Sequence, residues 1–149
     1  MSDDPVEQIP FNTVRNDRLR GGMKPVLECG LFHLRTESEW TERWAAARIG
    51  GPLPEIDWPR DTLIAIVGSV PDTSCNLRIK SLTKRGSTLD VDVETTSTHR
   101  GAATVVSRAW HVVAIRRAEI DQLNLITPNR GDWMFQKRDQ ALFAKADRA

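Results

Sequence analysis

The sequence carries almost no net charge, because 21 basic and 20 acidic side chains leave a formal charge of +1. General nucleic-acid binders usually show a clear basic excess, since their affinity comes from neutralising phosphates. The composition therefore argues against nucleic acid as a partner. Local basic patches remain possible, and nucleic-acid binding through Arg15, Arg18, Arg20 and Lys24 is a third hypothesis.

Cysteines and long apolar runs are also scarce. Cys29 and Cys75 form no CxxC pair, which favours two buried thiols over a disulfide and leaves both readings open. The longest apolar stretch, 63–67, is too short to span a bilayer. The first ten residues lack the basic start and apolar run of a signal peptide. We expect a cytoplasmic protein with no membrane partner, although a secreted form without its leader would look the same.

Catalytic, cofactor and metal motifs are missing as well. The sequence has no GxSxG, GxGxxG or GxxxxGK[ST] segment. His33, His99 and His111 do not stand at zinc-like spacings, either with one another or with the cysteines. His33 and His111 lie among apolar strand residues, which indicates satisfied core imidazoles. We therefore expect no catalytic residue, no cofactor and no metal.

A chain of 149 residues suits one domain, which can bury roughly 70% of its unfolded surface without a disulfide scaffold. We divide it into a flexible tail (1–8), a β-rich domain (9–117) and a C-terminal extension with a helix (118–149). The fold class is α+β: a mainly antiparallel sheet or sandwich-like domain with one packed helix and an added C-terminal helix.

One helix is well marked. Thr36 begins a capping box, in which its hydroxyl accepts the Glu39 amide and the Glu39 carboxylate reaches back to the Thr36 amide. Trp40 and Trp44 then repeat at helical spacing and give one apolar face. This pattern predicts a helix over about 37–48, ended by a Gly-Gly-Pro segment.

Strand patterns surround this helix, with polar loops expected at 15–25 and 95–104. The segment 62–68 is apolar on both faces, which predicts a central strand covered on both sides, the helix being the nearest cover. The other predicted strands are 9–14, 31–35 and 105–115.

A hairpin is expected between 75–80 and 89–94, around the three-residue loop Lys84-Arg85-Gly86. Apolar and charged residues alternate on both arms, which predicts that the apolar residues share the buried face and the charged residues share the exposed face. The expected register pairs Ile79 with Val91 and Leu77 with Val93 inside, and Arg78 with Asp92 and Lys80 with Asp90 outside. The acidic run Asp90, Asp92 and Glu94 is then neutralised and need not bind calcium.

The chain has five tryptophans and no tyrosine. Trp110 fits the core together with the two helix tryptophans. For Trp58 and Trp133 the sequence pattern does not decide between the core and the surface. Exposed tryptophan is enriched at interface hot spots, so both are interface candidates, with simple packing as the alternative. A closing helix over about 133–146, capped by Asp132, adds Phe135 and Leu142 as an apolar stripe that would dock on the domain or on another chain.

A rival function rests on the polar loop that contains His99 and Arg100. If folding brought them to His111, they could line the pocket of a small-ligand binder or enzyme. A solvated loop is the simpler interpretation.

Four segments carry a family resemblance: IPFNTV, ESEWTERW, PLPEIDWPRDTLIAIVG and NLRIKSLTKRGSTLDVDVET. Over roughly 9–116 the chain resembles the C-terminal domain of the protease-complex subunit PrcB. It departs from that family's pattern in the turn after Gly68, at Ala109-Trp110-His111 and in the added helix. The resemblance implies a bacterial, non-catalytic accessory domain that binds another protein, as the family's namesake supports a secreted serine protease.

Overall fold

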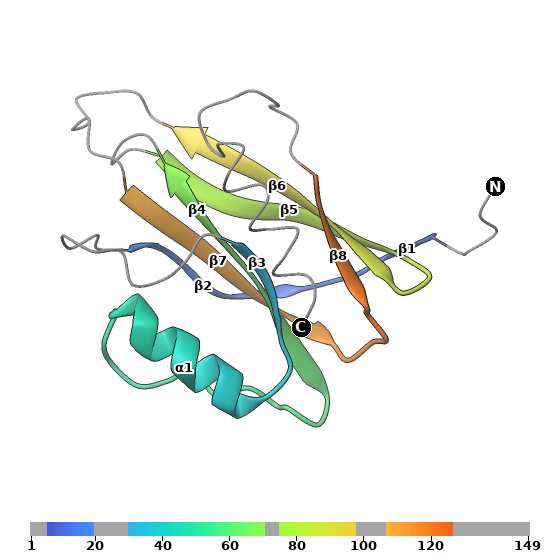
Figure 1. The fold of residues 1–149 in the computed structure, drawn as a ribbon, viewed down its shortest axis with the longest axis horizontal. Coiled ribbons are helices and arrows are strands. Elements are labelled where there is room, and N and C mark those ends of the chain that lie inside the picture. Colours follow the sequence, from blue (N-terminus) through green and yellow to red (C-terminus); the bar gives the residue numbers. More distant parts are fainter. Residues whose placement is uncertain (1–5, 20–29, 71–74, 98–106, 127–149) are drawn as a thin grey trace.

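The computed structural model describes residues 6–19, 30–70, 75–97 and 107–126 (Figure 1). These residues form a mainly β domain, in which two four-stranded sheets pack as a sandwich with one short helix on the outside. The expected sandwich and packed helix are confirmed, and the α+β class is corrected to mainly β. The second helix expected at 133–146 lies outside the described residues.

Eight strands and one helix follow one another in the described part of the chain. They are β1 (Val6–Gln8), β2 (Asn12–Leu19), β3 (Gly30–Leu34), α1 (Glu37–Ala47), β4 (Asp61–Val70), β5 (Cys75–Arg85), β6 (Thr88–Ser97), β7 (Ser107–Arg116) and β8 (Gln122–Ile126). Sheet A has the order β1-β5-β6-β8 and is mixed, because β8 runs parallel to β6. Sheet B has the order β2-β7-β4-β3 and is antiparallel.

The predicted central strand is confirmed as β4, which pairs with β7 on one side and β3 on the other. Its side chains alternate between two layers of core. Ile64 faces sheet A, whereas Leu63 faces helix α1, and both are fully buried. A strand covered on both faces must be apolar throughout, which explains the continuous run in the sequence.

Helix α1 begins and packs largely as its sequence predicts. The Thr36 hydroxyl accepts the Glu39 amide, as expected. The Glu39 carboxylate accepts the Arg35 amide at 2.8 Å, however, and not the amide of Thr36. The helix ends at Arg48, which adopts a left-handed conformation (φ 56°) before the glycines.

The hairpin has its predicted buried face, but the expected pairs and the three-residue loop are wrong. Strand β5 pairs Ile79 with Val93 and Leu82 with Val91, and the connecting loop is the two residues Gly86 and Ser87. Gly86 has φ 60°, which matches the glycine-first placement of a type II′ hairpin turn.

The shorter loop moves the register next to the turn, and a β-bulge then changes it by one residue further along the strands. The register shifts between Ile79 and Ser81, so that Lys80 is an extra residue on β5. Inward positions on β6 are two residues apart throughout, but on β5 the step from Ile79 to Leu82 is three. The extra residue restores the alternation of inward and outward side chains on β5, so that both Ile79 and Leu82 point into the core.

The ends of the domain also differ from expectation. Residues 6–8, assigned to a flexible tail, form β1 and pair with the end of β5. Residues 15–19, assigned to a loop, continue β2. Residues 122–126, assigned to the C-terminal extension, form β8 inside sheet A, so the sandwich extends past the boundary drawn at residue 117.

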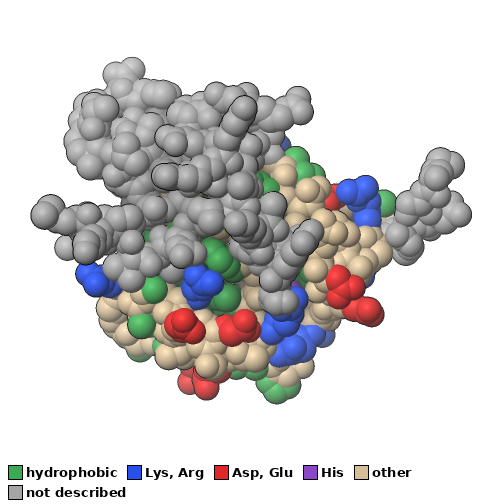
Figure 2. Space-filling view, viewed as in Figure 1, with side chains coloured by type: hydrophobic (Ala, Val, Ile, Leu, Met, Phe, Trp, Pro, Cys, Tyr) green, Lys and Arg blue, Asp and Glu red, His purple; other side chains and the backbone are tan. Residues whose placement is uncertain are grey.

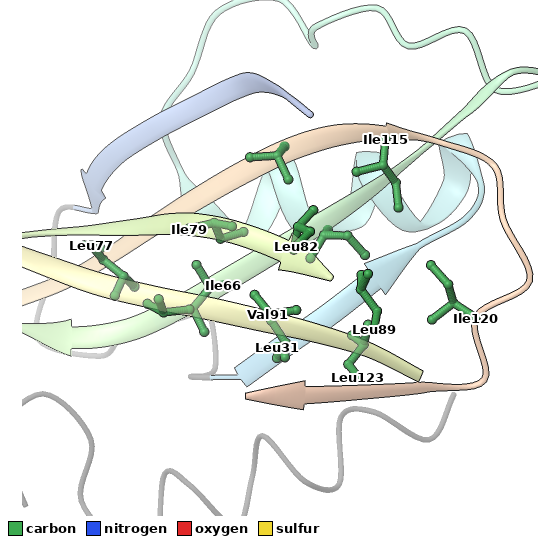
Figure 3. Packing of buried hydrophobic residues seen from close by; sticks show 14 residues of the cluster. Leu31, Ile66, Leu77, Ile79, Leu82, Leu89, Val91, Ile115, Ile120 and Leu123 are labelled. Carbon is green, nitrogen blue, oxygen red and sulfur yellow. The ribbon is translucent and has the colours of Figure 1, made fainter. Parts of the chain in front are cut away.

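Two apolar layers hold the domain together. Side chains from both sheets meet in the inter-sheet core, a cluster of 14 buried residues (Figure 3). The helix-side core lies between sheet B and α1, where the ring centroids of Trp40 and Trp110 lie 5.8 Å apart and those of Trp40 and Trp44 lie 5.6 Å apart. Trp40 and Trp110 are buried, which confirms their predicted core role.

Candidate functional site

The structure describes two of the candidate site residues, Trp58 and His111. The others lie outside the described residues and stay predictions: His99, Arg100, Trp133, Phe135 and Leu142. Both cysteines are outside this description too, Cys29 entirely and Cys75 in its side chain.

Trp58 is half-buried and packs against the helix-side core. Its carbonyl oxygen accepts a hydrogen bond from the Arg117 guanidinium, which also donates to the carbonyl of Arg35 at 2.8 Å. One arginine thus ties the connector before β4 to the junction between β3 and α1. The Trp58 ring is held by packing within the domain, and a role at an interface stays a prediction.

His111 links three strands from within the sandwich. It lies on β7 and is 2% exposed. Its Nδ1 atom is 2.8 Å from the backbone amide of Ile79 in sheet A, and its Nε2 atom is 2.8 Å from the hydroxyl oxygen of Thr13 on β2. Both ring nitrogens therefore have partners inside the protein, which leaves neither to bind a ligand or metal.

These contacts fix the protonation state of His111. The Ile79 amide can only donate, so Nδ1 must accept, and the proton of the neutral ring lies on Nε2 and is donated to Thr13. Burial, with a smaller effect of the Arg78 charge, lowers the pKa of His111 to about 4. The imidazole is a structural hydrogen-bonding group at neutral pH, as its apolar sequence context predicts.

His33 is the second buried imidazole. Its Nε2 atom lies 2.9 Å from the Thr62 hydroxyl on β4, and its Nδ1 atom is buried with no partner in the described part of the chain. Burial lowers the pKa of His33 to about 4, with the charges of Arg35 and Arg117 acting in the same direction and Glu39 opposing them. One of the two ring nitrogens of His33 therefore has a hydrogen-bond partner among the described residues, whereas the sequence predicts partners for both.

The outer face of sheet A carries the acidic run of β6, and its ion pairs differ from those expected. Arg78 pairs with Glu94 at 2.8 Å, not with Asp92. Asp90 is buried and binds Arg85 at 2.8 Å and the Asn124 amide at 3.0 Å. The two-residue loop and the bulge explain both changes, because they move the partners along the strands.

Charges of both signs also lie on the face shown in Figure 2, where neither sign dominates the described surface. Among the residues that the structure describes, buried or exposed, no group of three or more His, Cys, Asp and Glu side chains could hold a metal ion. No helix of the described residues is long and apolar enough to cross a membrane.

The end strands of the two sheets are β3 and β8 on one side of the sandwich and β1 and β2 on the other, and each has one strand neighbour among the described residues. On one side β3 and β8 lie next to each other, all five residues of β3 are buried, and the Arg35 guanidinium bridges the sheets by donating to the Ile120 carbonyl at 3.3 Å. On the other side β1 and β2 follow one another along the outside (Figure 1). Each of them pairs on one side only within the described residues.

This β1–β2 edge is the most site-like surface that the structure describes. Val6 is 65% exposed, and Glu7, Gln8, Asn12 and Thr13 are exposed as well. Alternate residues of β2 direct their backbone donors and acceptors away from β7, where no strand of the described residues pairs with them, and such an edge is a template for another strand.

Side chains on the helix side hold β2 rigidly. Arg15 and Asp17 form a two-pronged ion pair at 2.9 Å, and Arg15 lies over the ring of Trp44. Asp17 also accepts the indole N–H of Trp110 at 3.0 Å. The edge strand is therefore anchored to the core although it has one neighbour only.

The sequence predicts a short strand over 9–14, and Pro10 favours an edge position for it, but the full length of the edge is not predicted because 1–8 is assigned to a tail and 15–25 to a loop. Alternation gives no signal for a strand here, because Val14 is the one apolar residue between Asn12 and Asp17. Compared with known proteins, the chain matches no family model, no curated protein and no solved structure.

Proposed function

We propose that this chain is a non-catalytic accessory domain that binds another protein chain by accepting an extended strand along its β1–β2 edge. The observation that carries the proposal is the length and exposure of β2: it is an end strand of eight residues that pairs only with β7 among the described residues, whereas the end strands β3 and β8 have five residues each and β3 is buried throughout. Strand addition draws its affinity from main-chain hydrogen bonds and its specificity from alternate side chains.

Anchoring of β2 supports this role. An added strand loses less affinity when the edge that receives it is already ordered. The Arg15–Asp17 pair, the Trp110 indole and the Thr13–His111 bond hold the edge in its extended form before any partner arrives. The PrcB-like segments point the same way, because the resemblance implies an accessory domain and no catalytic machinery.

The rival function, a small-ligand pocket near His99, Arg100 and His111, has less support. It needs a free nitrogen on His111, and both of them are bonded inside the sandwich. No observation on the described residues favours it over strand addition.

The test is an affinity capture with wild-type domain and an edge-blocked variant. Val14 stands at the bulge of β2 and has no ladder partner on β7, so Val14→Pro alters the β2 edge at a position outside the regular ladder. Val14→Ala is the matched control, because it keeps the N–H and loses more packing. Both variants should first be shown to be folded by circular dichroism.

We expect a protein retained by the wild type and by Val14→Ala to be lost with Val14→Pro. Equal retention by all three forms would show that binding uses another surface. Retention of nothing specific by the wild type would remove the proposal.

A further inference from the structure

The geometry of β2 points to a second copy of this chain as the strand that adds to the edge, an inference that rests on the strand addition proposed above. The edge is complementary to itself in charge. Arg15 and Asp17 are two residues apart on the same face of β2, with Asn16 between them on the opposite face. When two such strands run antiparallel about a two-fold axis at Asn16, each Arg15 lies opposite Asp17 of the other copy.

Opposite residues in an antiparallel pair share a face, with Cβ atoms about 4.5–5.5 Å apart, and opposite charges there stabilise the pair. The side chains have capacity left for this contact. Arg15 uses Nε and Nη2 for Asp17 of its own strand, which leaves Nη1 to donate across the axis. The two-fold then makes two such contacts, so the interface is isologous.

Asn16 supplies a second, independent observation. Its Oδ1 atom is buried and has no hydrogen-bond partner in the described part of the chain. A buried carbonyl oxygen without a donor is costly. At the two-fold axis each Asn16 faces its copy, and a rotation of the side chains lets the amide N–H of one donate to the amide oxygen of the other.

Charge also selects this register over its neighbours. An axis at Arg15 would set the two Arg15 side chains against each other, and an axis at Asp17 would do the same with the carboxylates. A parallel pairing in register would repeat both repulsions along the strand. Only the antiparallel arrangement centred on Asn16 opposes unlike charges in both places.

Sedimentation equilibrium with single charge reversals tests this register. Arg15→Glu leaves two acidic residues at these positions, and Asp17→Lys leaves two basic ones. Each variant alone repeats like charges across the axis twice, which should weaken association roughly tenfold relative to the wild type. An equimolar mixture of the two opposes unlike charges again and should recover dimers.

The mixture also controls for folding, because unfolded variants could not rescue each other. A cross-linking measurement adds a readout at the axis. With both cysteines first replaced by serine, Asn16→Cys should be joined between copies by a short bismaleimide. Asn12→Cys, which lies away from the axis, should not.

A wild type that stays monomeric at every concentration, or single variants that dimerise as well as the wild type, would overturn the inference. If a different protein is then still captured in a Val14→Pro-sensitive way, the proposed strand addition stands and only the second copy is ruled out. If no protein is captured and no dimer forms, both fail together.

Discussion

The Nδ1 atom of His111 accepts the backbone amide of Ile79 at 2.8 Å, across the space between the two sheets. Ile79 stands directly before the bulge of β5, where the regular ladder is interrupted. A side chain of sheet B thus satisfies a backbone group of sheet A in the buried interior. The same ring reaches Thr13 on the exposed edge strand, so the core and the proposed binding edge share one residue.

Replacing His111 by leucine should lower the free energy of unfolding by about 1–3 kcal/mol, because the Ile79 amide would be buried without an acceptor. Thr13→Val is the matched control. It removes only the partner of Nε2, at an exposed position, and should cost less than about 1 kcal/mol. Urea unfolding measures both. Equal losses for the two variants would contradict the role given to the Ile79 bond.

Acid should destabilise the domain through its two buried imidazoles. Both have a pKa of about 4 when folded and about 6.5 when unfolded, so the unfolded chain binds more protons between these values. Their contribution is fully present above pH 6.5 and is lost as pH falls towards 4. Each ring contributes up to about 3 kcal/mol.

Urea unfolding from pH 7 to pH 4 checks this dependence. Carboxylates titrate in the lower part of the range, so the informative quantity is the difference between the wild type and the variants. His111→Leu should flatten the curve, and adding His33→Leu should flatten it further. Parallel curves for all three proteins would show that neither imidazole is held neutral by the fold.

Deleting Lys80 should be tolerated, because the residues left behind alternate regularly and keep Ile79 opposite Val93 and Leu82 opposite Val91. Deleting Arg78, in the same strand, should unfold the domain or cost several kcal/mol, since it turns Leu77 out of the core. Thermal unfolding compares the two deletions. A Lys80 deletion as harmful as the Arg78 deletion would indicate a register without the bulge.

Arg117→Met should destabilise the domain by about 1–3 kcal/mol, because two backbone carbonyls, those of Trp58 and Arg35, lose a charged donor. Arg116→Met is the control at the neighbouring position, which is exposed as Arg117 is but does not carry these two bonds, and it should change stability by less than about 0.5 kcal/mol. Fluorescence-monitored unfolding measures both. The same change for each would mean that Arg117 contributes as an ordinary surface charge.

The sequence predicted those parts of the fold that depend on residues close together along the chain. The Thr36 cap, the helix with Trp40 and the doubly buried strand β4 depend on neighbours close in sequence, and all three are confirmed. The buried face of the hairpin is confirmed for the same reason. Alternation sets which way a side chain points, whatever its partner across the sheet.

Register and strand ends could not be obtained in this way. The pairing of β5 with β6 depends on a bulge and on a II′-like turn, and an alternating pattern alone does not distinguish these from a three-residue loop. Strands β1 and β8 are short, and each is held by one neighbour distant in sequence. The candidate edge was missed because its backbone groups, and not its side chains, make it a site.

Strand addition at β2 is tested by residue-resolved amide hydrogen exchange on dilute, monomeric protein. We expect alternation along residues 12–19: amides bonded to β7 exchange slowly, whereas the outward amides between them exchange as fast as unprotected groups, and β4 is protected throughout. Uniform protection of residues 12–19, equal to that of β4, would show that this edge is already covered and would contradict strand addition there.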